Sequence, residues 1–258
     1  MMTAEETKEP LGYAVAIFVA FAALVAAANV VFGGPPDAVA EGRAVVGAVL
    51  LFVGAVTLVG LAAPLWLAGR GRLTLPVWPT PGTGDNALAV LLAVFLFARV
   101  EMLVAIFAEG RAWGPAAVTF FGPAAMHLAS VTATIGVLLP AFKRRMPVAP
   151  AATLAALAWV VYHVAQFHAF PEGRNISQLV VLAVFGLGYA LYYFWSRSLI
   201  LTAALQHLVA TTTLVYKGDY RFGSIDVPFY YSVVVVGVFL IFIVAKRRRY
   251  AAERFTHF

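Results

Sequence analysis

Four ionisable side chains interrupt otherwise apolar stretches of the sequence: Glu101, His127, His163 and His207. A carboxylate can accept a proton from water, and an imidazole can exchange a proton or bind a metal ion. An ionisable group is costly to place in hydrocarbon, so such residues normally face the interior of a helix bundle. If these four side chains meet, they form a candidate catalytic or metal site. If they do not, each histidine only hydrogen-bonds a neighbouring helix.

The apolar stretches that carry these residues are long enough to cross a membrane. The chain has 258 residues, of which 62% are hydrophobic and 12% charged, about half the charged fraction of soluble proteins. A helix of about 20 residues spans the ~30 Å hydrocarbon core of a bilayer. The sequence therefore predicts an all-α fold, a polytopic membrane helical bundle of about eight transmembrane helices in one integral membrane domain, residues 1–258. The predicted spans are Gly12–Phe32, Arg43–Ala68, Ala87–Ala108, Pro115–Phe142, Ala151–Phe170, Ile176–Trp195, Ser198–Tyr216 and Val227–Ala245.

Basic residues fall on alternate connections between these spans. Of the 18 Lys and Arg residues, twelve lie in the N-terminus, the even-numbered loops and the C-terminal tail, and five lie in the odd-numbered loops. Cytoplasmic loops carry the excess of basic residues, so we predict an integral protein of the plasma membrane with both termini in the cytoplasm. The same bias explains the formal charge of +6 without a nucleic-acid partner, because basic residues beside a span contact anionic lipid.

Helix geometry places the four ionisable residues at a common depth. With a rise of ~1.5 Å per residue, they lie roughly 12 to 20 Å above the cytoplasmic face of a core about 30 Å thick. Trp159 precedes His163 by four residues, and Thr211 follows His207 by four. Residues four apart share a helix face, so we expect Trp159 and Thr211 to help bind whatever these histidines contact.

Several other chemistries have no support in the sequence. There is no cysteine, which excludes disulfides, iron–sulfur clusters and thiolate metal sites. There is also no G-x-S-x-G, phosphate-loop or H-E-x-x-H motif, which leaves serine-hydrolase, nucleotide-binding and thermolysin-like functions without a basis.

The stretch GYALYYFWSRSLILTAALQHLVATT, residues 188–212, resembles the end of the CPBP intramembrane proteases, the CAAX-protease and bacteriocin-processing family. The family's H-x-x-x-N motif maps onto His207, with Thr211 in place of the asparagine. Its F-x-x-x-H motif maps onto Trp159 and His163, with Trp in place of Phe. The resemblance covers about residues 123–212. It implies a membrane-embedded peptidase fold with a peptide substrate and no required cofactor.

The family's E-E-x-x-x-R motif is missing. Its two glutamates fall on Ser130 and Val131, and its arginine falls on Ile135. In that family a glutamate activates water while the histidines assist and stabilise the oxyanion. Neither Ser130 nor Val131 can act as a general base, so the resemblance implies a degenerate or rewired active site. Glu101 could replace the base in a rewired peptidase, with His163 and His207 as the other catalytic residues.

Two other classes of function stay open. His127, His163 and His207 could bind a metal ion or haem, with Glu101 as a further ligand or a supporting group. Alternatively, the protein is a non-catalytic membrane partner or ligand-binding protein. Gly186 and Gly188 would let the sixth predicted span pack closely against a neighbouring helix, which is compatible with either function.

Overall fold

The computed structural model describes residues 9–32, 42–79, 87, 91, 124–166 and 176–216. Every regular element in these ranges is a helix, which confirms the predicted all-α fold. Glu101, the predicted span Val227–Ala245 and all but two residues of the predicted span Ala87–Ala108 lie outside the described residues.

The described helices form six rods. Two of the rods change locally from α-helix to the wider π-helix and back. The rods are α1 (Glu9–Phe32); α3 (Arg43–Val49), η1 (Leu50–Ala62) and α4 (Ala63–Gly69) in one rod; α7 (Ala124–Val131), η2 (Thr132–Gly136) and α8 (Val137–Lys143) in another; α9 (Val148–Gln166); α10 (Ile176–Ser196); and α11 (Leu199–Tyr216). These rods coincide with six of the eight predicted spans.

Four helical segments are long and apolar enough to cross a membrane: Leu11–Val31, Val45–Gly69, Ala124–Lys143 and Val148–Gln166. Two shorter apolar segments, Leu182–Ser196 and Leu199–Ala210, belong to α10 and α11. These segments describe a protein embedded in a lipid bilayer. A total of about eight spans stays a prediction, as do the plasma membrane and the cytoplasmic location of both termini.

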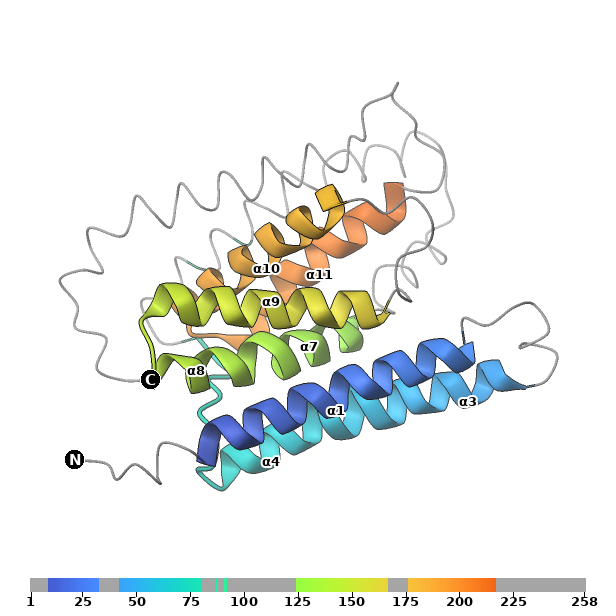
Figure 1. Cartoon of the computed structure of the whole chain (residues 1–258), viewed down its shortest axis with the longest axis horizontal. Coiled ribbons are helices and arrows are strands. Elements are labelled where there is room, and N and C mark those ends of the chain that lie inside the picture. Colours follow the sequence, from blue (N-terminus) through green and yellow to red (C-terminus); the bar gives the residue numbers. More distant parts are fainter. Residues whose placement is uncertain are drawn as a thin grey trace.

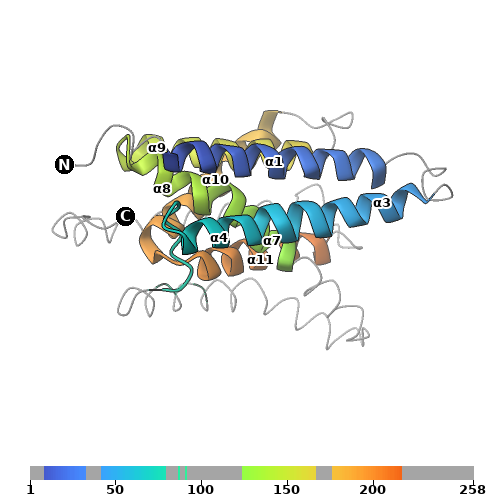
Figure 2. The same cartoon turned by 90° about the horizontal axis from the view of Figure 1, so that it is seen from below.

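Most rods lie roughly along the long axis of the bundle, with α1 beside the α3–η1–α4 rod and with α10 crossing at an angle (Figure 1). α1 also packs directly against α9, where the rings of Phe21 and Tyr162 meet. In Figure 2 α1 lies in one layer with α9 and α10, and the α3–η1–α4 rod and α11 lie in the layer below. The α7–η2–α8 rod is the central one. In its most apolar stretch 78% of the residues are buried, against 22% to 39% in the other three long apolar segments. This central rod carries His127 and Ser130.

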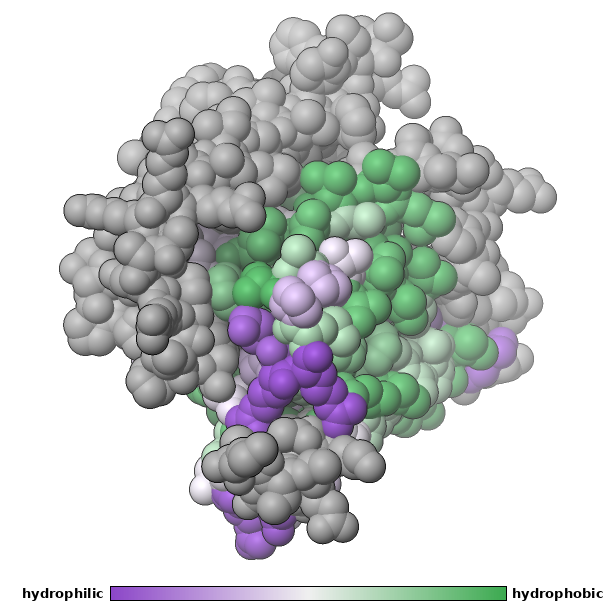
Figure 3. All heavy atoms as spheres, turned by 60° about the vertical axis from the view of Figure 1, so that its left-hand side comes forward, coloured by the Kyte–Doolittle hydropathy of each residue, from purple (hydrophilic) through white to green (hydrophobic). Residues whose placement is uncertain are grey.

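The outer faces of the bundle are apolar, as expected for contact with lipid. Large apolar side chains on α1 and on the α3–η1–α4 rod are exposed, among them Val19, Val30, Phe52, Val53 and Leu58. On the face seen in Figure 3, apolar side chains cover much of the described surface, and most hydrophilic side chains gather in one strip, with a smaller group at the right edge. The exposed arginines that end α4 and α8 are Arg70, Arg72, Arg144 and Arg145.

The start of α11 is held by a segment far away in the sequence. The backbone N–H groups of Leu199 and Ile200 donate to the carbonyls of Pro76 and Val77 at 2.9 and 3.3 Å. These N–H groups have no partner within their own helix. Arg197 adopts a left-handed conformation with φ of 49° at the turn between α10 and α11. The turn and the backbone bonds together fix where α11 enters the bundle, and thereby the position of His207.

Candidate functional site

The candidate site is centred on a contact between two imidazoles from different helices. His127 lies on α7 and His207 on α11, and their Nδ1 atoms are 2.9 Å apart. Their ring centroids are 5.1 Å apart and the rings are tilted by 56°. In a hydrogen bond one Nδ1–H must donate to the lone pair of the other Nδ1. The two histidines therefore carry their protons on different ring nitrogens, and they cannot both be imidazolium ions in this contact.

Ser130, which the resemblance to the CPBP family aligns with the first glutamate of its motif, lies one helical turn after His127. Its side chain is fully buried. The Ser130 Oγ lies 3.2 Å from Gln206 Oε1 and 2.9 Å from the carbonyl oxygen of His127. The single hydroxyl proton is thus shared between two oxygen acceptors, and neither of them is basic enough to remove it. This arrangement does not activate Ser130 as a nucleophile.

The other positions of the missing motif face apolar surroundings. Val131 and Ile135 are fully buried and belong to a hydrophobic cluster with Leu139, Trp159 and Tyr193. A charged side chain at either position would lack a partner there, which would be costly. The local packing is therefore suited to apolar side chains at these two positions.

His163 is oriented by its own helix. Its Nδ1 lies 2.9 Å from the carbonyl oxygen of Trp159, one turn earlier on α9. A carbonyl only accepts hydrogen bonds, so Nδ1 carries the proton and Nε2 presents its lone pair. The ring of Trp159 packs against His163 with centroids 3.7 Å apart, and Tyr162 meets the same imidazole edge-on at 4.6 Å.

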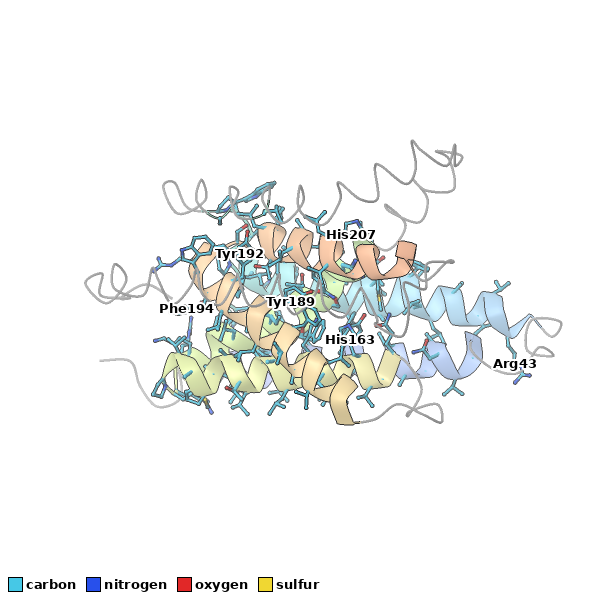
Figure 4. All side chains as sticks on the ribbon, turned by 90° about the horizontal axis from the view of Figure 1, so that it is seen from above. Arg43, His163, Tyr189, Tyr192, Phe194 and His207 are labelled. Atoms are coloured by element: carbon cyan, nitrogen blue, oxygen red, sulfur yellow. The ribbon has the colours of Figure 1, made fainter. Side chains whose placement is uncertain are left out.

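These histidines share one region of the bundle. His127 lies within electrostatic range of both His207 and His163. Figure 4 shows His163 on α9 and His207 on α11 at a similar level along the bundle. The Tyr162 side chain also interacts with Ser130, which links α9 to the central rod. The three histidines thus lie near one another in the bundle, and one pair, His127 and His207, makes a direct contact. Their common depth in the membrane stays a prediction.

The predicted metal ligands do not form a metal-binding group in the structure. Among the described residues, no three His, Cys, Asp or Glu side chains are placed to hold one ion. Two nitrogen ligands of a tetrahedral zinc ion, each about 2.0 to 2.1 Å from the metal, lie about 3.3 Å apart. The 2.9 Å between His127 and His207 fits a direct hydrogen bond better.

Two of the sequence-predicted site residues lie outside what the structure describes. Glu101 is outside the described residues, and Thr211 lies on α11 but its side chain is outside the described part. Conversely, Gln206 and Tyr162 both contact Ser130, although neither residue has a role predicted from the sequence. Gln206 offered one usable signal, because an amide inside an apolar helix needs a hydrogen-bonding partner.

Comparison with known proteins gives one match. The family model described as "Type II CAAX prenyl endopeptidase Rce1-like" matches residues 132–213. No curated protein and no solved structure matches the chain significantly. The matched range includes Trp159, His163 and His207, and it begins just after Ser130. Over this range the chain is similar to the type II CAAX prenyl endopeptidases, and the resemblance to the CPBP family predicted from the sequence is confirmed.

Proposed function

We propose that this protein is a CPBP-like membrane protein with a degenerate active site, which binds a peptide in the bilayer and does not hydrolyse it. The observation that carries the proposal is the state of Ser130. It occupies the position of a catalytic glutamate, and its proton is shared between Gln206 and a backbone carbonyl. The two motif histidines, His163 and His207, are retained.

The described side chains favour binding over hydrolysis. Hydrolysis needs a group that accepts a proton from water within hydrogen-bonding distance. The helices α7, α9, α10 and α11, which carry the three histidines and Ser130, contain no Asp or Glu that could act as the carboxylate base of the family. The Nδ1 atoms of His127 and His207 bond to each other, and the Nδ1 of His163 bonds to the Trp159 carbonyl. These side chains provide hydrogen-bonding atoms within an apolar bundle. Such atoms can bind the polar groups of a ligand that is otherwise apolar.

The family match indicates which peptide to test. We expect the purified protein, reconstituted in nanodiscs, to bind a fluorescent farnesylated peptide ending in a CAAX sequence and to leave it intact. Anisotropy measures binding, and mass spectrometry of the peptide measures cleavage. Replacement of His163 or His207 by alanine should weaken binding. The same peptide without the farnesyl group serves as the control. Cleavage above background, or no binding at all, would contradict the proposal.

A rewired peptidase is the main alternative, with Glu101 as the general base and with Trp159 and Thr211 contacting the substrate. It is supported by the depth that Glu101 shares with the three histidines in the sequence. The cleavage measurement separates the two proposals, because a rewired enzyme would cleave the peptide and would lose that activity on Glu101→Gln. Cleavage that survives this substitution would exclude Glu101 as the base.

A metal- or haem-binding membrane subunit is the second alternative. It is supported by the sequence, in which His127, His163 and His207 lie in separate apolar spans and could each supply a ligand nitrogen. Elemental analysis and the visible absorption spectrum of the purified protein test it. A stoichiometric metal or haem that is lost in both His127→Ala and His207→Ala would favour this alternative. Co-purification of a second membrane protein in fixed ratio would instead favour a non-catalytic partner.

The proposed orientation can be tested independently of the site. With both termini in the cytoplasm of a cell whose plasma membrane holds the protein, a C-terminal fusion to green fluorescent protein should fluoresce. A C-terminal fusion to alkaline phosphatase should be inactive. The opposite pair of results would reverse the predicted orientation.

A further inference from the structure

Trp159 carries a buried hydrogen-bond donor that the described structure does not satisfy. Its side chain is 3% exposed, and its Nε1 atom has no hydrogen-bond partner among the described residues. A buried indole N–H normally finds an acceptor, because the donor loses its bond to water without replacement. The acceptor for Trp159 must therefore come from outside the described side chains.

The Trp159 ring is held in place from two sides. His163 packs against it with centroids 3.7 Å apart, and Tyr189 of α10 meets it edge-on at 5.4 Å. On the same helix as Tyr189, Gly186 lies so close that an added Cβ would be 3.1 Å from Trp159 Cε3. The indole cannot rotate freely to another acceptor, so the direction of its N–H is set by the packing.

The charge of the surroundings selects a neutral acceptor. The helices α7, α9, α10 and α11 carry no Lys, Arg, Asp or Glu. A carboxylate or phosphate brought to Trp159 would find no cation on these helices, and a buried charge without a partner is strongly disfavoured. A carbonyl oxygen accepts a hydrogen bond without this cost.

We propose that Trp159 Nε1 donates a hydrogen bond to a backbone carbonyl of the bound peptide, next to His163, at a point where that peptide is not helical. This inference rests on the proposed peptide-binding function. The carbonyls inside a helix are already bonded to their own chain, whereas those of an extended peptide need partners within a membrane protein. Trp159 stands where the CPBP motif has phenylalanine, so the indole adds a donor that phenylalanine lacks. Trp159 is in this way a specificity-determining residue for an extended peptide.

The indole N–H can be observed directly. Protein labelled with 15N at tryptophan, in nanodiscs, gives indole signals of which the Trp159 signal is identified by its loss in Trp159→Phe. On addition of the farnesylated CAAX peptide, we expect the Trp159 indole proton to shift downfield. We also expect Trp159→Phe to bind the peptide about 2- to 10-fold more weakly, the effect of one neutral hydrogen bond. Trp66→Phe is the matched control, since Trp66 is 57% exposed on the outer surface, and it should leave the affinity unchanged.

Peptide analogues with one backbone carbonyl reduced to a methylene locate the acceptor. One analogue should lose affinity for the wild-type protein by the same factor and lose none for Trp159→Phe. Replacing Trp159 by benzothienylalanine, a ring of the same shape without the N–H, should reproduce the effect of phenylalanine, which excludes a change of packing as its cause.

The outcomes separate this inference from the proposed function. If the peptide binds while the Trp159 signal stays unmoved and Trp159→Phe binds equally well, the inference is wrong and the proposed function stands. The same conclusion holds if the signal is already shifted downfield in peptide-free nanodiscs, because lipid or the protein itself then supplies the acceptor. If the wild-type protein binds no peptide, the proposed function fails and the inference fails with it.

Discussion

Replacing Gly186 with alanine tests the closest approach between α9 and α10. An alanine Cβ at this position would lie 3.0 Å from the Ala156 carbonyl oxygen, 3.1 Å from Trp159 Cε3 and 3.2 Å from the Ala156 Cα. Carbon contacts are optimal at about 3.5 to 4.0 Å. Two of the three atoms belong to the backbone of α9, so the crowding can be relieved only if a helix shifts.

The magnitude follows from comparison with Gly188 on the same helix. An added Cβ at Gly188 meets nothing within 4 Å among the described atoms. Both substitutions gain about 1 kcal/mol of helix propensity, but only Gly186→Ala adds an overpacking cost of about 1 to 3 kcal/mol. Gly188→Ala should therefore be the more stable variant by about 1 to 3 kcal/mol, because the propensity gain is common to both and cancels.

Reversible unfolding in mixed micelles of increasing SDS content, followed by circular dichroism, measures the free energy of unfolding of both variants. If α9 shifts to relieve the crowding, Trp159 moves with it, so Gly186→Ala should also bind the peptide more weakly. Gly188→Ala should bind the peptide as tightly as the wild type. Equal stability of the two variants, to within about 0.5 kcal/mol, would refute the packing of α10 on α9 described above.

Three further predictions concern the buried hydrogen bonds. Tyr192→Phe should lower the free energy of unfolding by about 1 kcal/mol in the same SDS titration, because the Tyr192 hydroxyl donates to the Ala87 carbonyl at 2.8 Å; no change would show that this bond is not formed. In a double-mutant cycle, His127→Ala and His207→Ala should show a coupling of about 0.5 to 1.5 kcal/mol, and additive effects would contradict their contact. Ser130→Ala should cost up to about 1.5 kcal/mol and leave the peptide intact as in the wild type, whereas loss of a measured cleavage activity would show that Ser130 is catalytic.

The membrane helices could be predicted from composition alone because the bilayer imposes a simple rule. Each crossing segment must be apolar and must satisfy its backbone internally, so a run of about 20 apolar residues is a helix. The residues of the predicted span Ser198–Tyr216 form the helix Leu199–Tyr216, and those of Ile176–Trp195 form the helix Ile176–Ser196. That these two helices cross the membrane stays a prediction. In the fourth predicted span, Pro115–Phe142, the described part of the helix begins at Ala124.

The level of each residue along its helix could also be predicted from the sequence, because a helix advances by a constant rise per residue. This property placed His127, His163 and His207 in one slab. Which side of each helix faces its neighbours could not be predicted from the sequence, since an all-apolar helix has no polar face that would orient it. The three histidines could not be distinguished from the sequence. In the structure His127 contacts His207, and the Nδ1 of His163 lies against the Trp159 carbonyl.

The sequence by itself determined an all-helical membrane protein, the level of each histidine along its own helix and the absence of the CPBP glutamates, because each of these depends on residue type and spacing within one segment. The tertiary structure decided which histidines touch, which of two glycines is essential to packing, and that the indole of Trp159 is buried without an acceptor among the described residues. These features depend on how separate helices rotate and pack against one another, and no single segment encodes that arrangement.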